Sequence, residues 1–461
     1  MKKKFRIEKD SIGNKKIENS FLWGAQTQRS LENFDIGEEK IPNEIIIAIG
    51  YQKKAAALTN IELGKLDGKI GKAIIAACDQ IINSNLNNQF PLSVWQTGSG
   101  TQTNMNANEV ISNYAIKKLK GKIGSKIPVH PNDHVNLSQS SNDTFPTVMH
   151  IASNQIIETK LINSLKKIKK ILSDKTKIYK DIIKIGRTHT QDATPITLGQ
   201  VFSGYLEQIK NNEKRILEAK KELQFVVQGG TAVGTGINSP KNFDKYFCKN
   251  LSKITKSTYS PASNKFEGIA AHDSLVNLSG ALNGLATSLF KISNDIRFLA
   301  SGPRAGLGEI ILPTNEPGSS IMPGKVNPTQ IEALSMVCLQ VMGNNLTTTI
   351  AGSQGHFELN AYKPVIIYNI IQSLNLLSDS INSFVEKCLK GLKPNKINIR
   401  ENLLNSLMLV TALNNFIGYD NAAKIAKKAF KENLTLKEAA IKLKLVDIKK
   451  FDRIVDPKKM I

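Results

Sequence analysis

Long stretches of helical periodicity with few helix-breaking residues restrict the fold of this chain more than any other feature. Apolar residues recur at helical spacing in residues 43–63, 67–85, 144–184, 195–224, 266–300, 328–349 and 364–389. Helices as long as those in the middle of the chain are typical of a bundle or a coiled coil. Because no heptad pattern with paired flanking charges persists, we predict an all-α protein built on a large helical bundle.

The segment that begins near Pro394 differs from the rest of the chain. Its predicted helices are shorter and its lysines are more frequent. No repeat of fixed period and no low-complexity linker precedes it. We therefore predict a small, separate C-terminal helical domain over residues 393–461.

The charge of the chain is strongly positive. Lysine and arginine number 62 against 39 aspartates and glutamates, a formal charge of +23 among 461 residues, and only 8 of the cations are arginine. Arginine is the usual residue for bidentate recognition of phosphates and base edges, and the lysines are scattered, so no nucleic acid is expected as a partner. We attribute the excess to solvated helix faces, with a secondary attraction for anionic substrates.

Neither a membrane span nor a secretory signal is expected. The longest uncharged stretch, residues 333–357, is too rich in Asn, Thr and Gln to cross a bilayer. The basic start of the chain is followed by Glu8 and Asp10 instead of an apolar run. Four widely spaced cysteines without CxxC spacing predict reduced thiols in a cytoplasmic protein. They are Cys78, Cys248, Cys338 and Cys388.

Five loops between the predicted helices concentrate hydroxyl and amide side chains. They cover residues 97–106, 130–133, 138–143, 186–192 and 318–328. Several lead directly into a helix, and helix N-termini offer free N–H groups and a partial positive charge that suit carboxylates or phosphates. We expect three helix starts here, each with a capping residue. The expected caps are Asn142 or Asp143 before Pro146, Thr194 before Pro195, and Asn327 before Pro328.

Lysine nearly disappears from one segment. The 71 residues between Lys291 and Lys363 contain a single lysine, Lys325, where the average of the chain predicts about eight. We expect most of this segment to be buried, because lysine is frequent on solvated faces elsewhere. Lys325 lies in a Gly/Pro loop, which indicates a charge that pairs with an anion in a buried site; an incidental lysine on a surface loop is the alternative. Glu332 is a second isolated charge in apolar surroundings.

His189 is the strongest candidate among six histidines. It lies among hydroxyl side chains just before a predicted helix, so a catalytic role and a packed or solvated histidine remain equal alternatives on spacing alone. His130 and His134 have the spacing of a helical metal pair, but Pro131 lies between them and no third ligand is evident, so no metal is expected. The glycine-rich residues 229–236 follow a helical stretch and lack the Walker lysine, which favours a break between helices over a nucleotide loop.

Residues 318–328, Gly-Ser-Ser-Ile-Met-Pro-Gly-Lys-Val-Asn-Pro, resemble the signature of the fumarase/aspartase superfamily. The resemblance covers almost the whole chain, from residues 23–30 to residues 417–426. Three details are similar to the iron-independent, class II fumarate hydratases of this superfamily. They are the loop 98–106, His189 where aspartases typically have glutamine, and Gly324 where aspartases tend to have alanine.

This resemblance implies a three-domain, all-helical subunit and a homotetramer whose central domains form a long helical core. The expected domains are an N-terminal helical domain (residues 1–139), the central long-helix bundle (140–392) and the C-terminal domain (393–461). It also implies the reversible hydration of fumarate to L-malate in the tricarboxylic acid cycle, without a cofactor or a metal. Each site is expected to combine loops of three subunits, which fits loops that lie far apart in the sequence and carry few functional groups each.

The resemblance also assigns roles to individual residues. Ser319 is the base that removes the C3 proton, His189 handles water as acid and base, and Glu332 is the charge partner of His189. A free serine is a weak base, so Ser319 must be activated by the cationic loop and by nearby N–H groups. Lys325, Asn327 and the helix that follows suit an aci-carboxylate intermediate, which carries an extra negative charge. The implied substrate-binding residues are Ser99, Gly100, Thr101, Ser140, Ser141, Asn142, Thr188, Ser320, Lys325, Val326 and Asn327.

His130, Pro131, Asn132 and Asp133 resemble an accessory dicarboxylate site. The family often has a basic residue just before it, whereas Ile127 and Pro128 stand there in this chain. We therefore predict weak or absent accessory binding.

Three alternatives remain open. An aspartate ammonia-lyase would add ammonia to fumarate in place of water, and His189 argues against it. A nucleic-acid-binding protein is suggested only by the charge. A catalytically silent relative, like the lens crystallins of this superfamily, disagrees with the intact Ser319, Lys325 and Glu332.

Overall fold

The computed structural model describes residues 4–461, and within them helices dominate, which confirms the predicted all-α class. Seventeen α-helices, α1–α17, are accompanied by four small two-stranded sheets in this part of the chain. By their contacts the residues form two compact units. Unit 1 contains residues up to 163, 212–286 and 338–378, and unit 2 contains residues 164–211, 287–337 and 379–461. The division into three domains at residues 139 and 392 stays a prediction.

Apart from the long helices described below, unit 1 contains helices whose starts follow their local sequence. The predicted stretches 43–63 and 67–85 form α2 (Asn43–Glu62) and α3 (Gly68–Ile82). The Asp67 carboxylate caps α3 by accepting the N–H groups of Lys69 and Ile70, which explains why the helix begins there. The other helices are α1 (Ala25–Asn33), α4 (Thr101–Lys118), α5 (Ser141–Ile156), α8 (Phe243–Thr255) and α9 (Lys265–Ala270).

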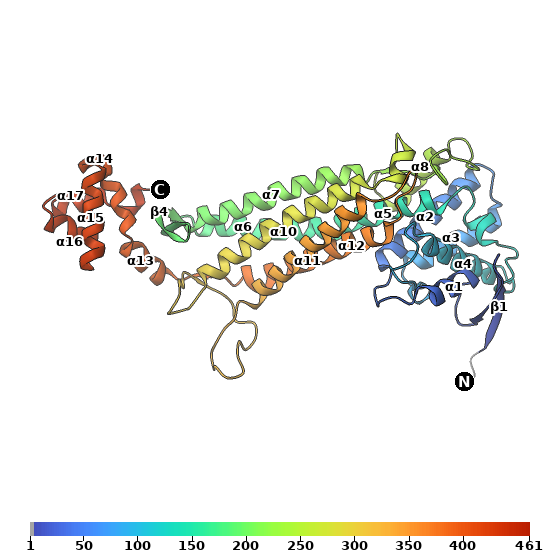
Figure 1. The fold of residues 1–461 in the computed structure, drawn as a ribbon, viewed down its shortest axis with the longest axis horizontal. Coiled ribbons are helices and arrows are strands. Elements are labelled where there is room, and N and C mark those ends of the chain that lie inside the picture. The colour runs from blue at the N-terminus through green and yellow to red at the C-terminus, as the bar shows by residue number, and fades with distance from the viewer. Residues whose placement is uncertain (1–3) are drawn as a thin grey trace. The chain divides into compact units, whose positions relative to one another are not determined.

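Five long helices form the predicted bundle: α6 (Ile162–Ile178), α7 (Leu198–Glu222), α10 (Asp273–Leu299), α11 (Thr329–Gly352) and α12 (Lys363–Phe384). These helices are labelled in Figure 1, and hydrogen bonds join neighbouring helices inside each unit. In unit 1, α11 contacts both α10 (Asn345 to Ser279, 3.0 Å) and α12 (Asn344 to Ser373, 3.0 Å). In unit 2, α7 contacts α10 (Tyr205 to Asp295, 3.0 Å), α10 contacts α11 (Ser293 to Ser335, 3.4 Å), and α12 contacts α6 (Asn382 to Ser164, 2.9 Å).

Several boundaries differ from the predictions. The expected helix start at Thr194–Pro195 is wrong, because Pro195 lies in strand β4 (Gln191–Thr197), which pairs with β3 (Ile183–Thr188) before α7 begins. The stretch 266–300 divides at Ala271, whose extended backbone separates α9 from α10. The stretches 144–184 and 364–389 contain π-helical turns, Ile157–Leu161 and Val385–Leu389, within otherwise helical runs. The remaining predicted stretches match their helices within a few residues.

The C-terminal residues of unit 2 form short helices with a core of their own. Leu413, Ile425 and Ala439 lie at its centre and are fully or almost fully buried. A capping box in which Thr435 and Glu438 exchange bonds opens α16. The helices are α13 (Lys396–Asn405), α14 (Asn414–Ile417), α15 (Tyr419–Glu432), α16 (Leu436–Lys442) and α17 (Ile448–Ile454).

The sheets of the described residues are small, with two strands each. Besides β3 and β4, the described pairs are β1 (Phe5–Lys9) with β2 (Asn14–Glu18), β5 (Phe225–Val226) with β6 (Ser260–Pro261), and β7 (Ile310–Ile311) with β8 (Lys393–Pro394). Only the pair of β5 and β6 is parallel. Short 3-10 helices occur at Asn87–Gln89, Leu407–Leu413 and Pro457–Lys459, and another π-helical turn at Pro131–Val135.

The lysine-poor segment is not mostly buried in the single chain, so this prediction is wrong at the level of one subunit. The loop around Lys325 is exposed, with Ile321 83% accessible. Along α11, Met336, Leu339, Leu346 and Ile350 are 55–65% exposed. Their spacing of three, seven and four residues places them on one face of the helix. Lysine is absent here because the surface is apolar, not because the single chain buries it.

The four cysteines are free thiols, as their spacing predicts. Cys78, Cys248, Cys338 and Cys388 are all free and buried. Among residues 4–461, no helix is both long and apolar enough to cross a membrane.

Candidate active site

The loop before α4 places two hydroxyl side chains at a helix N-terminus. Ser99 Oγ and Thr101 Oγ1 lie 2.7 Å apart, and Ser99 is only 9% exposed. Gly100 between them has a left-handed backbone (φ 75°), and a Cβ atom there would lie 2.5 Å from the Phe145 ring. Glycine is therefore required both by the backbone conformation and by the close ring. The sequence folds here into a tight turn that aims the first N–H groups of α4 at the loop.

The segment before α5 forms a second helix N-terminus of the same kind. Ser140 is the N-cap: its hydroxyl accepts the N–H of Asn142, and Asp143 in turn accepts the N–H of Ser140. The prediction that Asn142 or Asp143 caps this helix is thus wrong by two or three positions, because Asp143 takes the reciprocal place of a capping box. Asn142 Nδ2 donates to the Ala232 carbonyl at 2.8 Å.

A single asparagine brings these two N-termini together. Asn104, in the first turn of α4, donates to Ser141 Oγ at 2.9 Å. The Ser99–Thr101 loop and the Ser140–Asn142 segment are therefore neighbours in unit 1, as expected for residues that bind one ligand. Two helix N-termini and several hydroxyl groups at one place suit a carboxylate.

Two ionisable residues of opposite charge, Lys53 and Asp143, are fully buried in this part of unit 1. Lys53 Nζ donates to Asn136 Oδ1 (2.9 Å) and Gln139 Oε1 (3.0 Å). Burial lowers the pKa of Lys53 to about 7, and attraction to Asp143 opposes this fall. Burial raises the pKa of Asp143 to about 6, although the backbone N–H groups that it accepts favour its charged form.

Two further basic side chains, Lys363 and His272, are buried in unit 1, and Lys363 contacts the first loop. The backbone N–H of Lys363 donates to the Gly98 carbonyl (2.9 Å), and its Nζ donates to the Asn360 carbonyl (2.6 Å). Burial lowers the pKa of Lys363 to about 7. His272 is also buried, which lowers its pKa, and its Nε2 has no hydrogen-bond partner among the described residues.

In unit 2, His189 occupies the tip of the hairpin between β3 and β4. Thr188 pairs with Gln191, so His189 and Thr190 form a two-residue turn, and both have a positive φ (56° and 62°). Such turns usually contain Asn or Gly, so histidine and threonine here hold a strained backbone of the kind found at functional sites. Thr188 and His189 are exposed, and the His189 imidazole has no hydrogen-bond partner among residues 4–461.

The base of this hairpin is fixed by a buried ionic cluster. Glu309, which is fully buried, lies 2.6 Å from Arg187 Nη2 and 3.1 Å from Lys184 Nζ. Burial lowers the pKa of Lys184, and attraction to Glu309 opposes this change. The cluster gives the exposed His189 a rigid support.

The loop 318–328 holds Ser319 in a geometry that favours its ionised form. Ser319 Oγ accepts the backbone N–H groups of Ile321 (3.2 Å) and Met322 (3.1 Å). The loop is closed by a bond from the Gly318 N–H to the Lys325 carbonyl (3.0 Å). A Cβ atom at Gly318 would lie 2.3 Å from that carbonyl oxygen, so only glycine permits this closure. Two N–H groups directed at one hydroxyl oxygen stabilise the negative charge of an alkoxide.

The other predicted residues of this loop are arranged around the start of α11. Asn327 Nδ2 donates to the Gly318 carbonyl, while Ser320, Lys325 and Val326 are exposed. The N–H groups of Ile331 and Glu332 bond to the Pro328 carbonyl, so the predicted helix start after Asn327 is confirmed within one residue.

Two expectations for this segment are wrong in the single chain. Lys325 lies on an exposed loop and not in a buried site. Glu332 is not isolated in apolar surroundings, since its side chain is 44% exposed and lies 3.8 Å from Arg297. Among the described residues, no hydrogen bond or ion pair links Glu332 to His189, so this pairing stays a prediction.

The accessory segment uses its own polar groups. His130 Nδ1 accepts the N–H groups of Asn132 (3.2 Å) and Asp133 (3.1 Å), and His134 Nδ1 accepts the N–H of His130 (2.8 Å). Pro131, which is buried, opens this π-helical turn. Burial lowers the pKa of His130, and Asp133, 3.3 Å away, opposes this change. The N–H groups that could hold an anion are thus already satisfied, which supports the prediction of weak accessory binding.

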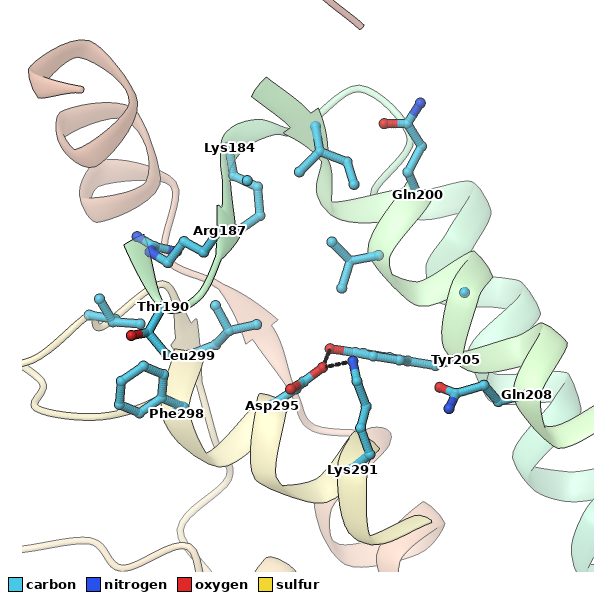
Figure 2. A pocket seen from close by; sticks show the side chains of 15 residues that line it. Lys184, Arg187, Thr190, Gln200, Tyr205, Gln208, Lys291, Asp295, Phe298 and Leu299 are labelled. Atoms are coloured by element: carbon cyan, nitrogen blue, oxygen red, sulfur yellow. Dashed lines mark hydrogen bonds and ion pairs between the residues drawn. The ribbon is translucent and has the colours of Figure 1, made fainter. Parts of the chain in front are cut away.

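A cavity of about 720 Å³ in unit 2 contains none of the predicted site residues. It lies between α7, α10 and the β3–β4 hairpin, and its wall is largely apolar. Figure 2 shows Tyr205 and Lys291 pointing at Asp295, which bonds to both. We place the candidate site at the loops instead, because the hydroxyl groups and helix N-termini are found there.

No metal or nucleotide motif emerges from the remaining candidates. The residues that the structure describes contain no group of three or more His, Cys, Asp or Glu that could hold a metal ion. The glycine-rich residues 229–236 form a loop between β5 and α8, as predicted, and the N–H groups of Gly229 and Thr231 bond to Asp143.

Lys53 is not among the residues predicted from the sequence, and Asp143 is predicted only as a helix cap. Lys53 precedes Lys54 and three alanines, so it reads as part of a solvated lysine pair. A signal was present, since Lys53 continues the apolar face that contains Ile45 and Ile49 at intervals of four residues.

Known proteins resemble this chain over its full length. A family model described as Lyase matches residues 13–343, and one described as Fumarase C C-terminus matches residues 409–461. "Fumarate hydratase class II" of Rickettsia conorii is 60% identical over 459 residues, with 100% of this chain and 99% of the relative covered. The protein of the same name from Bacillus subtilis is 54% identical over 457 residues, with 99% of each covered. The crystal structure of recombinant class II fumarase from Schistosoma mansoni superposes with a TM-score of 0.97 at 45% identity, covering 99% of both chains.

Proposed function

Since this chain belongs to the class II fumarate hydratase family, we propose that it interconverts fumarate and L-malate by adding and removing water. The observation that carries the proposal is the full-length similarity to fumarate hydratases, which includes both ends of the chain. We propose further that it acts in the tricarboxylic acid cycle in the cytoplasm. The expected ligand is a small dicarboxylate, and neither a cofactor nor a metal is assigned a role.

The two helix N-termini of unit 1 are proposed to bind a carboxylate group of the substrate. Ser99 and Thr101 at the start of α4, and Ser140, Ser141 and Asn142 at the start of α5, supply hydroxyl and amide groups. Each N-terminus adds backbone N–H groups and a partial positive charge, which favour an anion. Fumarate and malate are dianions, so the other carboxylate also requires a polar or cationic region; Lys325 is proposed to supply the positive charge, with the neutral Asn327 beside it.

Ser319 is proposed to remove the C3 proton of malate in the dehydration direction. Removal of this proton places an additional negative charge on the adjacent carboxylate, and Lys325, Asn327 and the N-terminus of α11 are suited to stabilise it. The two N–H groups that Ser319 Oγ accepts lower the cost of ionising its hydroxyl, which supports the assignment of the base. The C2 hydroxyl then leaves as water.

His189 is proposed to give a proton to the departing hydroxyl, and to take one from water in the hydration direction. Its position at a hairpin tip, where the imidazole has no partner among the residues that the structure describes, suits a side chain that meets substrate on another subunit. We propose that Glu332 becomes its charge partner in the assembled enzyme. Thr188, Ser320 and Val326 are proposed to contact substrate beside these residues.

We propose a homotetramer with sites shared between subunits, because the single chain leaves an apolar helix face exposed. The α11 face that contains Leu339 and Leu346 is apolar and exposed. An exposed apolar patch of this kind usually marks an interface with another protein chain. Packing of this face against other subunits would also explain the scarcity of lysine between Lys291 and Lys363.

The proposal is tested by following the ultraviolet absorbance of fumarate with the wild-type protein. Consumption of fumarate without ammonium supports the hydratase, whereas consumption only with ammonium would identify an aspartate ammonia-lyase. Absence of both would indicate a catalytically silent relative.

The residue assignments are tested by Ser319→Ala and His189→Asn in the same assay. We expect each to lower kcat by about 100-fold or more, since general acid–base groups contribute factors of this size. Thr190→Ser, at the adjacent turn position, serves as the control and should retain turnover. Near-normal kcat in Ser319→Ala would remove the assignment of the base.

A further inference from the structure

Lys53 is connected to the Ser140–Asn142 segment by a chain of hydrogen bonds. Its side chain is fully buried, and among residues 4–461 no carboxylate forms an ion pair with it. It donates to the side-chain oxygens of Asn136 and Gln139, and the same Asn136 oxygen accepts Asn104 Nδ2 at 3.2 Å. Asn104 also donates to Ser141 Oγ. The Lys53 ammonium is thus linked to a predicted substrate-binding hydroxyl through two amide side chains.

Asp143 supports the same segment from its other side. It is fully buried and accepts three backbone N–H groups at 2.9 Å each, those of Ser140, Gly229 and Thr231. One carboxylate therefore joins the start of α5 to the loop 229–231, which is 86 or more residues distant in the sequence.

The loop that Asp143 holds also orients Asn142. The Ala232 carbonyl, one residue beyond Thr231, accepts Asn142 Nδ2 at 2.8 Å. Because its NH₂ group donates in this bond, the loop fixes the orientation of the Asn142 amide and therefore the direction of its Oδ1 oxygen. A shift of residues 229–231 would therefore turn the Asn142 amide.

We propose that Lys53 and Asp143 are positioning residues that hold the Ser140–Asn142 segment in its substrate-binding orientation without touching substrate. The inference rests on the proposed function, in which this segment binds a carboxylate. Both side chains are fully buried, so they act through Asn136, Gln139 and the loop 229–231. Uniform weakening of substrate and transition-state binding raises KM and leaves kcat nearly unchanged, which a general loss of folded enzyme does not do.

The test compares Lys53→Met and Asp143→Asn with wild type. Methionine fills a similar volume without the donors, and asparagine replaces one acceptor oxygen by an NH₂ group that faces a backbone N–H. We expect each variant to raise KM for fumarate about tenfold or more, with kcat within about threefold. Because the two residues hold one segment, the double variant should raise KM by less than the product of the single effects.

Matched controls lose the same chemical groups elsewhere. Glu109→Gln removes a buried carboxylate that accepts the N–H groups of Gly24, Gln26 and Thr27 at α1, and Lys175→Met removes a buried ammonium that donates to Tyr179 and the Leu392 carbonyl. Both should lower the melting temperature and leave KM unchanged. Should Asp143→Asn fail to fold, Asn136→Leu removes one of the two acceptors of Lys53, the one shared with Asn104, while leaving both charges in place, and it should raise KM as well.

Two results would overturn the inference. One is an unchanged KM in folded Lys53→Met, Asp143→Asn and Asn136→Leu; the other is an equal rise of KM in the Glu109→Gln and Lys175→Met controls. Calorimetric titration of each protein with fumarate separates the inference from the proposed reaction. A wild type that binds fumarate without turnover contradicts the reaction alone, and the same comparison of affinities still decides the positioning role.

Discussion

Burial of Lys53 makes the stability of this protein depend on pH in the alkaline range. In the unfolded chain a lysine keeps its proton up to about pH 10.5, whereas in the folded protein the pKa of Lys53 is about 7. Between these values the unfolded state holds more protons, so the free energy of unfolding rises with pH, by at most about 1.4 kcal/mol for each pH unit. Below the folded pKa both states are protonated and this slope disappears.

The prediction is checked by the melting temperatures of wild type and Lys53→Met at pH 7 and pH 9.5. The variant lacks the titrating group, so wild type should gain stability relative to it as the pH rises. Lys54→Met, which removes the neighbouring lysine from its surface pair with Asp79, is the control and should change in parallel with wild type. Parallel curves for Lys53→Met as well would contradict a lowered pKa at Lys53.

Residues near the site differ in how far they could be predicted from the sequence. Ser319 and His189 lie in loops whose composition is unusual, so local pattern and family resemblance both point to them. Lys53 does not stand out, because whether a helical lysine faces solvent or core depends on which helices cover it. Gln139 and Asn136, its partners, are more than 80 residues away.

At the scale of elements, the turn before α4 depends on Gly100. Alanine there would adopt a left-handed backbone at a cost of about 1–2 kcal/mol, and its Cβ would also press on the buried Phe145 ring. We expect Gly100→Ala to lower the melting temperature by several degrees and to raise KM, because the turn places Ser99 and Thr101. Thermal melting and fumarate kinetics measure both effects.

Gly64→Ala is the matched control for this turn. Gly64 has a similar left-handed backbone (φ 65°), but nothing lies within 4 Å of the Cβ that alanine would add. It should therefore show only the backbone cost, with KM unchanged. Equal losses in both variants would mean that contact with Phe145 contributes nothing.

Helix existence was predictable from periodicity, whereas several helix ends were not. The stretches that became α2, α3 and α11 are read correctly, because a capping residue or a proline marks their starts. The prediction for Pro195 is wrong because a proline at a helix start and a proline in a strand before a helix look alike in sequence. The pairing of β3 with β4 places Pro195 in a strand. The true cap of α5, Ser140, is followed by four further polar residues, Ser141 to Thr144, each of which could also cap a helix.

At the scale of the whole molecule, the exposed face of α11 predicts how the enzyme assembles. A glutamate at Leu346 would place a charge in an apolar contact between subunits, where an unpaired charge is costly. We expect Leu346→Glu to lower the mass in solution below that of four chains and to abolish turnover, because the sites proposed to be shared between subunits would separate. Light scattering coupled to size exclusion measures the mass.

Ile12→Glu is the control for this change. Ile12 is 74% exposed, compared with 62% for Leu346, but it lies in the loop between β1 and β2. Its substitution should leave mass and turnover unchanged. A Leu346→Glu protein that remains tetrameric and active would exclude α11 from the interface. The expectation that most of the lysine-poor segment is buried is wrong for the single chain, because a sequence does not say whether its own chain or another copy covers an apolar face.

The four buried cysteines give the chain a set of internal reporters. Burial raises the pKa of each thiol to about 12, so at neutral pH they are protonated as well as hidden, and thiol reagents should scarcely attack the native protein. Cys78, Cys248 and Cys338 belong to unit 1, and Cys388 belongs to unit 2. The time course of modification, read by mass spectrometry at each position, would therefore record separately how often each unit opens, with no label introduced by design.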